Sequence, residues 1–262
     1  MRLGLAAGSA QEPGPQSHSQ ETHMKIADKT ILITGASRGI GRALVDAALL
    51  RGAKRVYAGT RGPLPHADAR VMAVKLDVTS AEDIQRAVGS IDSLDVLVNN
   101  AGIAPYDDLS NAEVLERTFA VNLFGVLNVT RAFLPLLKRS RGAVVNHLSM
   151  VALAALPLIP AYSISKAAAL NLTQSLRALL AGDGVKVHGV VLGPVDTDMN
   201  RGFDIPKATT ESAAVGIFDG LERGEEDIFP DPASQSIADG WRNGAAKALE
   251  RQLAAFVPGN AA

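Results

Sequence analysis

The sequence predicts a single α/β domain in which a doubly wound parallel sheet is flanked by helices. From Lys25 onward, short β-branched runs alternate with longer helical patterns, and no internal repeat or second-domain boundary interrupts them. Strands that alternate with helices form parallel β-α-β units joined by right-handed crossovers. The 262 residues, 47% of them hydrophobic, are enough to bury a full core without metal or disulfide support.

Local residue patterns place each element in turn. The first strand is the apolar run 30–34, and a helix over 39–52 follows it and is closed by Gly52. Further strands are predicted at 55–59, 70–76, 94–100, 142–150 and 185–192. Further helices are predicted at 80–88 with Ser80 as its cap, at 111–139, and around Tyr162. Beyond residue 200 the pattern weakens to a polar segment (200–226), a short apolar piece (227–232) and a helical run (236–257).

Composition narrows the classes of function. The net charge of −1 gives no electrostatic reason to expect nucleic acid or an anionic membrane as a partner. The absence of cysteine excludes disulfides and zinc–thiolate sites, and no metal site is predicted. No apolar run approaches the roughly 18–20 residues of a membrane span. We expect residues 1–23 to be a disordered leader, residues 24–262 to be the domain, and the protein to be cytoplasmic.

A glycine-rich turn follows the first strand directly. Gly35, Gly39 and Gly41 lie in TGASRGIG, at the mouth of the first helix. Missing side chains let the backbone approach a pyrophosphate, whose charge is favoured at a helix N-terminus. A glycine turn without a ligand is the alternative, but the order strand, turn, helix favours dinucleotide binding.

The end of the second strand indicates which dinucleotide binds. An acidic residue there would accept a hydrogen bond from a free ribose 2′-hydroxyl. This chain has Thr60 and Arg61 instead, and Arg38 lies in the glycine turn. Two guanidiniums that converge on this corner favour a 2′-phosphate, unless both are simply solvated surface charges. The sequence therefore predicts NADP(H) over NAD(H).

Several motifs in fixed order resemble the short-chain dehydrogenase/reductase family. The matching segments are TGASRGIG (34–41), LDV (76–78), NNAG (99–102), VNLFG (121–125), HLSM (147–150), AYSISK (161–166) and GPVDT (193–197). The resemblance implies a Rossmann-type fold, a homodimer or homotetramer, and a catalytic tetrad of Asn122, Ser149, Tyr162 and Lys166. Leu192 departs from the family's usual proline, and the usual glycine-rich ending is missing.

The same resemblance, together with the glycine turn and the two arginines, gives a set of expected cofactor contacts. They are Gly35, Ser37, Arg38, Gly39, Ile40, Gly41, Thr60, Arg61, Asp77, Val78, Asn99, Ala101, Gly102, Tyr162, Lys166, Gly193, Val195 and Thr197. Asp77 and Val78 would flank the adenine, and Val195 and Thr197 would meet the carboxamide end of the nicotinamide.

Tyr162 and Lys166 are four residues apart, which predicts that they share one helix face about one turn apart. A free tyrosine has a pKa near ~10, and we expect the Lys166 ammonium to lower the pKa of Tyr162. Tyr162 would then donate a proton to the developing alkoxide while Ser149 polarises the same oxygen. The resemblance adds that Lys166 binds the nicotinamide ribose and that Asn122 holds a water in the proton relay.

The loop 150–160 is almost wholly apolar, which predicts a hydrophobic pocket for a ketone or aldehyde. Met150, Leu153 and Leu156 are its candidate lining, with core packing as the alternative, and a substrate loop is expected at about 195–225. An NADPH-dependent carbonyl reductase is the favoured function. An NAD-dependent alcohol dehydrogenase and a non-catalytic dinucleotide-binding sensor are the alternatives.

We predict structural rather than catalytic roles for the three histidines outside the leader. His147 lies beside Ser149, but no glycine elbow surrounds the serine, so we predict a packed or rim histidine rather than a nucleophilic pair. His188 is predicted to be a hydrogen-bonded core residue, and His66 to be an exposed loop residue.

Overall fold

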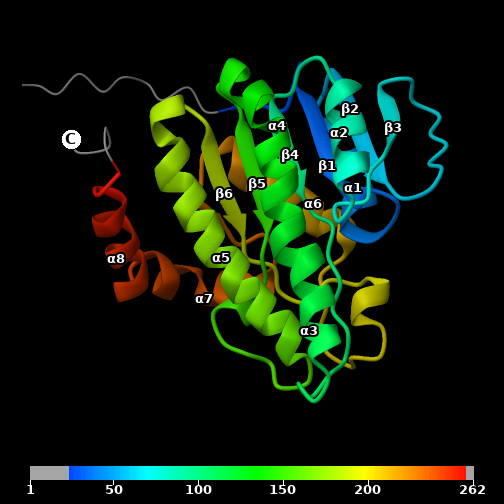
Figure 1. The fold of residues 1–262 in the computed structure, drawn as a ribbon. Coiled ribbons are helices and arrows are strands. Elements are labelled where there is room, and N and C mark those ends of the chain that lie inside the picture. Colours follow the sequence, from blue (N-terminus) through cyan, green and yellow to red (C-terminus); the bar gives the residue numbers. More distant parts are fainter. Residues whose placement is uncertain (1–23, 258–262) are drawn as a thin grey trace, which may run out of the picture.

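The computed structural model describes residues 24–257, whose strands form a seven-stranded parallel sheet in the order β3-β2-β1-β4-β5-β6-β7 (Figure 1). The strands are Thr30–Thr34 (β1), Arg55–Thr60 (β2), Val71–Lys75 (β3), Val96–Asn99 (β4), Ala143–His147 (β5), Lys186–Val190 (β6) and Asp227–Ile228 (β7). The predicted parallel α/β sheet is confirmed. The predicted leader, 1–23, lies outside the described residues.

Helices cover both faces of the sheet (Figure 1). One face packs on α1 (Gly39–Leu50) and α6 (Thr210–Glu222), and the other packs on α2 (Ala81–Gly89), α4 (Val126–Ser140) and α5 (Pro160–Leu180). Along β1, Ile31 and Ile33 join the first core cluster and Leu32 joins the second. Successive strand side chains point to opposite faces, so a strand buried on both sides is a continuous apolar run.

The winding reverses at β1, which lies between β2 and β4. In open α/β sheets, a ligand crevice forms at the carboxyl ends of the strands where the winding changes direction. The glycine turn follows β1 and the NNAG segment follows β4, so both lie at this crevice. The topology thus defines where a dinucleotide could cross the sheet.

The helix predicted at 111–139 consists of three segments. α3 (Ala112–Phe119) leads into a π-helical turn at Ala120–Gly125 and then into α4. Together, Ala112–Ser140 is the one helix of the described residues that is long and apolar enough to cross a membrane, since an 18-residue window within it has a mean hydropathy of 1.5. No uninterrupted apolar run marks it in the sequence. Phe133 and Leu137 are fully buried against the sheet, which identifies it as a core helix.

The region beyond residue 200 is more regular than the sequence indicates. The polar segment 200–226 contains α6, whose Ile217 and Phe218 are fully buried, and the apolar piece 227–232 contains β7. The predicted helical run is two helices, α7 (Pro232–Arg242) and α8 (Ala245–Ala254), which meet at Gly244.

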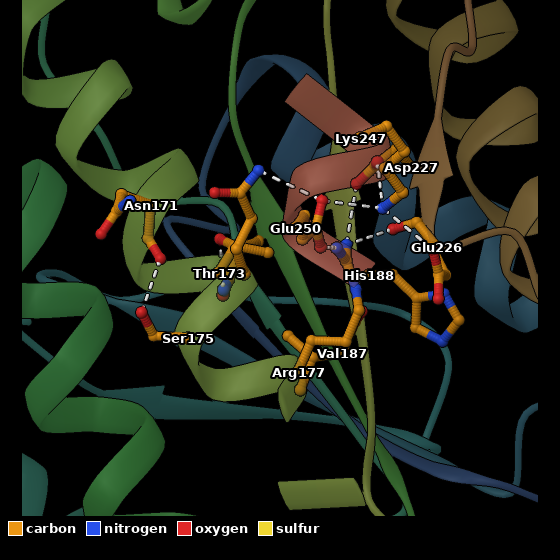
Figure 2. A network of polar contacts seen from close by, with 12 residues as sticks. Asn171, Thr173, Ser175, Arg177, Val187, His188, Glu226, Asp227, Lys247 and Glu250 are labelled. Carbon is orange, nitrogen blue, oxygen red and sulfur yellow. Dashed lines mark hydrogen bonds and ion pairs between the residues drawn. The ribbon is translucent and has the colours of Figure 1, made fainter. Parts of the chain in front are cut away.

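Charged residues hold α8 against α5 and the sheet edge (Figure 2). This C-terminal ion cluster comprises Arg177, Glu226, Asp227, Lys247 and Glu250. The Lys247 Nζ lies 2.9 Å from the carboxylates of Glu226 and Asp227 and 3.0 Å from that of Glu250. Arg177 pairs with Glu250 and, at 2.7 Å, with Asp227. Desolvation raises the pKa of Asp227, but the Arg177 and Lys247 charges outweigh it, and the net pKa falls.

Candidate active site

A cleft of about 1000 Å³ lies at the carboxyl ends of the strands, between the glycine turn and the start of α5. It brings together residues that are far apart in the sequence. The expected site residues that line it are Gly35, Ser37, Arg38, Gly39, Ile40, Gly41, Thr60, Arg61, Asp77, Val78, Ala101, Gly102, Tyr162, Lys166 and Thr197. Asn99, Asn122, Ser149, Gly193 and Val195 lie outside this lining.

The glycine turn lets its backbone pack closely and leaves room for a ligand to approach that backbone. Gly35 has a φ of +66°, and a Cβ on Gly41 would lie 2.3 Å from the Gly35 carbonyl oxygen. The Asn100 side chain donates to the carbonyls of Thr34 (2.8 Å) and Gly35 (3.1 Å) and so fixes the turn. Asn100 was not among the expected contacts, although it is the second residue of NNAG. The turn at the N-terminus of α1 fits a pyrophosphate.

The far end of the cleft is formed by the ends of β2 and β3. The Thr60 hydroxyl is buried and donates to the Gly62 carbonyl, so it is engaged within the protein. Asp77 accepts hydrogen bonds from the Thr79 hydroxyl (2.7 Å) and amide (2.9 Å). These bonds lower the pKa of Asp77, and the Arg61 charge lowers it further. Exposed Arg61 and ionised Asp77 thus meet at the same end of the cleft.

Arg38 is held by an ion pair across the mouth of the cleft. Its Nη1 lies 2.9 Å from the Asp198 carboxylate, which follows Thr197 and also pairs with Arg201. The pair joins the glycine turn to a segment 160 residues later in the chain. The guanidinium predicted to bind a 2′-phosphate therefore has a protein carboxylate as its partner.

Tyr162, Lys166 and Ser149 meet at the other end of the cleft. The Lys166 Nζ lies 5.6 Å from the centre of the Tyr162 ring and donates to the His147 carbonyl at 2.6 Å. The Ser149 side chain hydrogen-bonds that of Tyr162. Ser149 also caps the short 3₁₀ turn Met150–Ala152, which orients its hydroxyl. The three side chains therefore lie close enough together to contact the same bound molecule.

Burial controls how this pair titrates. Desolvation raises the pKa of Tyr162 to about 12, and the hydrogen bond with Ser149 offsets only part of the rise. Desolvation also lowers the pKa of Lys166 to about 8. The expected lowering of the Tyr162 pKa by Lys166 is wrong, because desolvation of the phenol dominates and the pKa rises. Tyr162 is therefore protonated at neutral pH, the form that a proton donor needs.

Asn122 lies in the π-helical turn and is fully buried. Its Oδ1 accepts from the Ile103 amide, and its Nδ2 donates to the Ile103 carbonyl and to the Ser165 hydroxyl, all at 2.9 Å. A π-helical turn inserted into an α-helix often marks a functional site. Here it turns Asn122 toward the loop after β4 and toward α5, next to Lys166.

Three other expected contacts lie behind the cleft lining, inside the protein. The Asn99 Nδ2 donates to Thr130 at 3.0 Å and to Asn146 at 2.9 Å, inside the protein. Val195 is buried. The Gly193 amide donates to Asp231 at 2.8 Å, and Asp231 also caps α7. Asp231 is a supporting residue that the sequence did not reveal, because its link to Gly193 depends on the fold beyond residue 200.

The apolar wall differs from the one predicted. Met150 and Leu153 pack in a cluster with Phe229 and Trp241, away from the cleft, because α7 covers them. The apolar residues that line the cleft include Ile103, Pro105, Leu148, Leu192 and Met199. The rings of Tyr106 and Phe203 stack with their centres 5.8 Å apart and join the loop after β4 to the segment after Thr197.

The histidines have distinct surroundings. His147 is buried and lines the cleft, as a packed histidine, and His188 is buried with its Nδ1 2.6 Å from the Glu225 carbonyl oxygen. His66 was predicted to be exposed but is mostly covered, since its Nδ1 accepts from the Asp68 amide and its Nε2 faces Asp46. Within residues 24–257, no group of three or more His, Cys, Asp or Glu side chains could hold a metal ion.

Comparisons with known proteins place this cleft in context. A family model described as short chain dehydrogenase matches residues 29–207. The chain is 36% identical to 2-(S)-hydroxypropyl-CoM dehydrogenase 3 of Xanthobacter autotrophicus over 186 residues, 65% of this chain and 73% of that one. It is 32% identical to sorbitol dehydrogenase of Cereibacter sphaeroides over 78% of this chain and 81% of that one. A crystal structure of a short chain dehydrogenase from Burkholderia cenocepacia in complex with NADP is 38% identical, with a TM-score of 0.80 over 88% of this chain and 99% of that one.

Proposed function

The chain belongs to the short-chain dehydrogenase/reductase family, and on that premise we propose that it is an NADPH-dependent reductase of an apolar ketone or aldehyde. The family makes it an oxidoreductase that uses NAD(P). The observation that best supports carbonyl reduction is the meeting of a protonated Tyr162, its partner Ser149 and the buried Lys166 at one end of the cleft. A small carbonyl compound is the proposed partner.

The proposed preference for NADPH rests on charge. Arg38 and Arg61 both line the cleft, and the second strand ends without an acidic residue that would repel a 2′-phosphate. The NADP complex of the Burkholderia relative supports the same choice. The residues that would hold the cofactor are those of the glycine turn, Arg61, Asp77, Gly102 and Lys166.

The chain's own residues would manage the proton and the substrate oxygen. When bound, the reduced nicotinamide supplies the hydride that the carbonyl carbon receives. Tyr162 donates its proton to the substrate oxygen, and the Ser149 hydroxyl polarises that oxygen. Lys166, with a pKa of about 8, can return a proton toward Tyr162 near neutral pH. Asn122 hydrogen-bonds both the Ile103 backbone and Ser165 of α5, and so fixes the loop and the helix next to Tyr162 and Lys166.

The apolar character of the substrate is inferred from the cleft wall. Ile103, Pro105, Leu148 and Met199 offer no charge to a phosphorylated or acidic substrate. The stacked rings of Tyr106 and Phe203 add an aromatic surface between the two loops, which supports the proposed substrate loop after Thr197.

The test is a Tyr162→Phe variant measured against a panel of ketones and aldehydes. We expect kcat to fall at least about a hundredfold while NADPH binding is retained, because only the proton donor is lost. Tyr57→Phe, in the core of β2, is the matched control and should keep its activity. A Tyr162→Phe enzyme with near-normal turnover would remove Tyr162 from the mechanism.

An NAD-dependent alcohol dehydrogenase is the second candidate. The Arg38–Asp198 ion pair favours it, because a guanidinium already paired to a carboxylate binds a 2′-phosphate less strongly. Two relatives are also named as dehydrogenases. Comparing kcat/KM for NADPH, NADH, NADP⁺ and NAD⁺ separates the two candidates. Cofactor binding with no turnover in any combination would favour the third, a non-catalytic sensor.

A further inference from the structure

His147 is a polar side chain that the proposed mechanism does not use. It ends β5, lines the cleft together with Tyr162 and Lys166, and is only 5% exposed. Its carbonyl oxygen is occupied by Lys166. Its Nε2 is buried and has no hydrogen-bond partner among the described residues. Buried polar atoms in folded proteins are nearly always paired. Of the two unpaired histidine nitrogens among the described residues, only that of His147 belongs to a residue that lines the cleft, which points to a group bound there.

The chemistry of the side chain limits what that group can be. Burial, together with the Lys166 charge, lowers the pKa of His147 to about 3, so the imidazole is neutral near physiological pH. A neutral imidazole carries one donor and one acceptor. It therefore complements an uncharged amide or hydroxyl better than a phosphate, for which a cation would be the better partner.

The position of β5 in the sheet indicates which part of the cofactor lies next to His147. Arg61 and Asp77 follow β2 and β3, on one side of the point where the winding reverses, and His147 lies on the other side. A dinucleotide that crosses this point with its adenosine at Arg61 brings its nicotinamide half to β5. The nicotinamide carboxamide has both a donor and an acceptor, like the imidazole.

We propose that His147 hydrogen-bonds the nicotinamide end of the bound cofactor and so fixes the ring beside Tyr162. The proposal rests on the proposed function, since it needs a nicotinamide cofactor in the cleft. It makes His147 a positioning residue for the cofactor, not a proton donor. A nucleophilic pair with Ser149 is a poor alternative. A histidine whose pKa is lowered to about 3 is too weak a base to take the serine proton.

The first test separates the two halves of the cofactor. A His147→Leu variant removes the hydrogen bond and keeps an apolar side chain, and we expect it to bind NADPH roughly three- to tenfold more weakly by calorimetry. Binding of 2′-phospho-ADP-ribose, which lacks the nicotinamide, should be unchanged. His147→Gln keeps a donor and an acceptor and should recover most of the affinity for NADPH.

His188→Leu is the matched control. His188 is also buried with an Nε2 that has no partner within the described chain, but it lies outside the cleft lining. Its replacement should leave the NADPH affinity unchanged, even if it alters stability. A similar loss in both leucine variants would mean that the effect is structural, and would overturn the proposal.

A second readout does not depend on any variant. With ¹⁵N-labelled histidine, one ring nitrogen of His147 should shift when NADPH is added and not when 2′-phospho-ADP-ribose is added. The imidazole should remain neutral between about pH 5 and 9. No shift, or equal loss of both ligands in His147→Leu, would overturn the proposal while leaving the proposed function intact. If the wild-type protein binds neither NADPH nor NADH, the proposed function and this inference fail together.

Discussion

The pKa values of Tyr162 and Lys166 are shifted because the surrounding protein desolvates both side chains. The pKa of the tyrosine is raised to about 12 and that of the lysine is lowered to about 8, so each is shifted toward its neutral form. The two shifts divide the roles at neutral pH. The phenol holds a proton, and the lysine is the group that can gain or lose one near the pH at which the enzyme works.

This division predicts the pH dependence of the reduction. The pKa of Lys166 falls from its usual 10.5 to about 8 in the folded protein, so the lysine loses its proton as pH rises through about 8. We expect kcat for carbonyl reduction to be highest below that pH and to fall above it. Stopped-flow or steady-state rates at saturating NADPH, measured between about pH 6 and 10, check this. A flat profile up to pH 10 would exclude Lys166 from the proton supply.

Asp198 is expected to compete with the cofactor phosphate for Arg38. The Arg38–Asp198 pair is largely exposed, and such pairs contribute about 0.2–1 kcal/mol. Asp198→Asn should therefore lower KM for NADPH by up to roughly fivefold and leave KM for NADH nearly unchanged. Asp204→Asn, an exposed aspartate on the same segment, is the control. An equal change for both cofactors would show that Asp198 does not act through Arg38.

The sequence indicated which candidate residues lie together better than it indicated their surroundings. Tyr162, Lys166 and Ser149 lie close to one another, because the spacing along one helix and the end of β5 are local features, and their catalytic roles stay predictions. The direction of the Tyr162 pKa shift could not be predicted, because it depends on how tightly distant segments exclude water. The orphaned Nε2 of His147 is likewise visible only in three dimensions.

At the scale of elements, β-branched runs located the six longer strands, and α6 was missed. Two glycines, Gly216 and Gly220, interrupt its helical pattern in the sequence. In the structure they are close contacts, since a Cβ on Gly216 would lie 2.6 Å from the Pro230 carbonyl oxygen and one on Gly220 would lie 2.5 Å from Ile228. The two glycines disfavour a helix by intrinsic propensity, but their missing side chains let α6 approach β7.

The C-terminal ion cluster is expected to contribute strongly to stability. Lys247 is 2% exposed, and its ammonium is surrounded by three carboxylates. Lys247→Met leaves those carboxylates without their cation, and we expect a loss of about 3 kcal/mol in the free energy of unfolding. Lys138→Met, which breaks the surface pair with Asp183, should cost less than about 1 kcal/mol. Urea titrations of both variants check this, and equal losses would contradict it.

For the whole molecule, a second copy of the chain remains a predicted partner. Phe124 of the π-helical turn is 51% exposed and Ile164 of α5 is 41% exposed, on two elements that contact each other. Apolar residues exposed on neighbouring elements are typical of a subunit interface. The cytoplasmic location and the leader at 1–23 also remain predictions.

We expect the double variant Phe124→Glu, Ile164→Glu to be monomeric in analytical ultracentrifugation, and the wild-type protein to be at least a dimer. Charges placed on both elements would be buried without partners if the copies still paired. Leu50→Glu, on the exposed side of α1, is the control and should keep the wild-type mass. A monomeric wild-type protein would contradict the prediction.

The C-terminal ion cluster also has a consequence for biosynthesis. Arg177, Glu226 and Asp227 emerge from the ribosome before Lys247 and Glu250 do. Until then, the two carboxylates next to β7 lack the ammonium that offsets their desolvation. A nascent chain halted before Lys247 would lack the cation that pairs with these carboxylates at the β7 edge of the sheet. Complete packing of this edge therefore depends on the synthesis of α8.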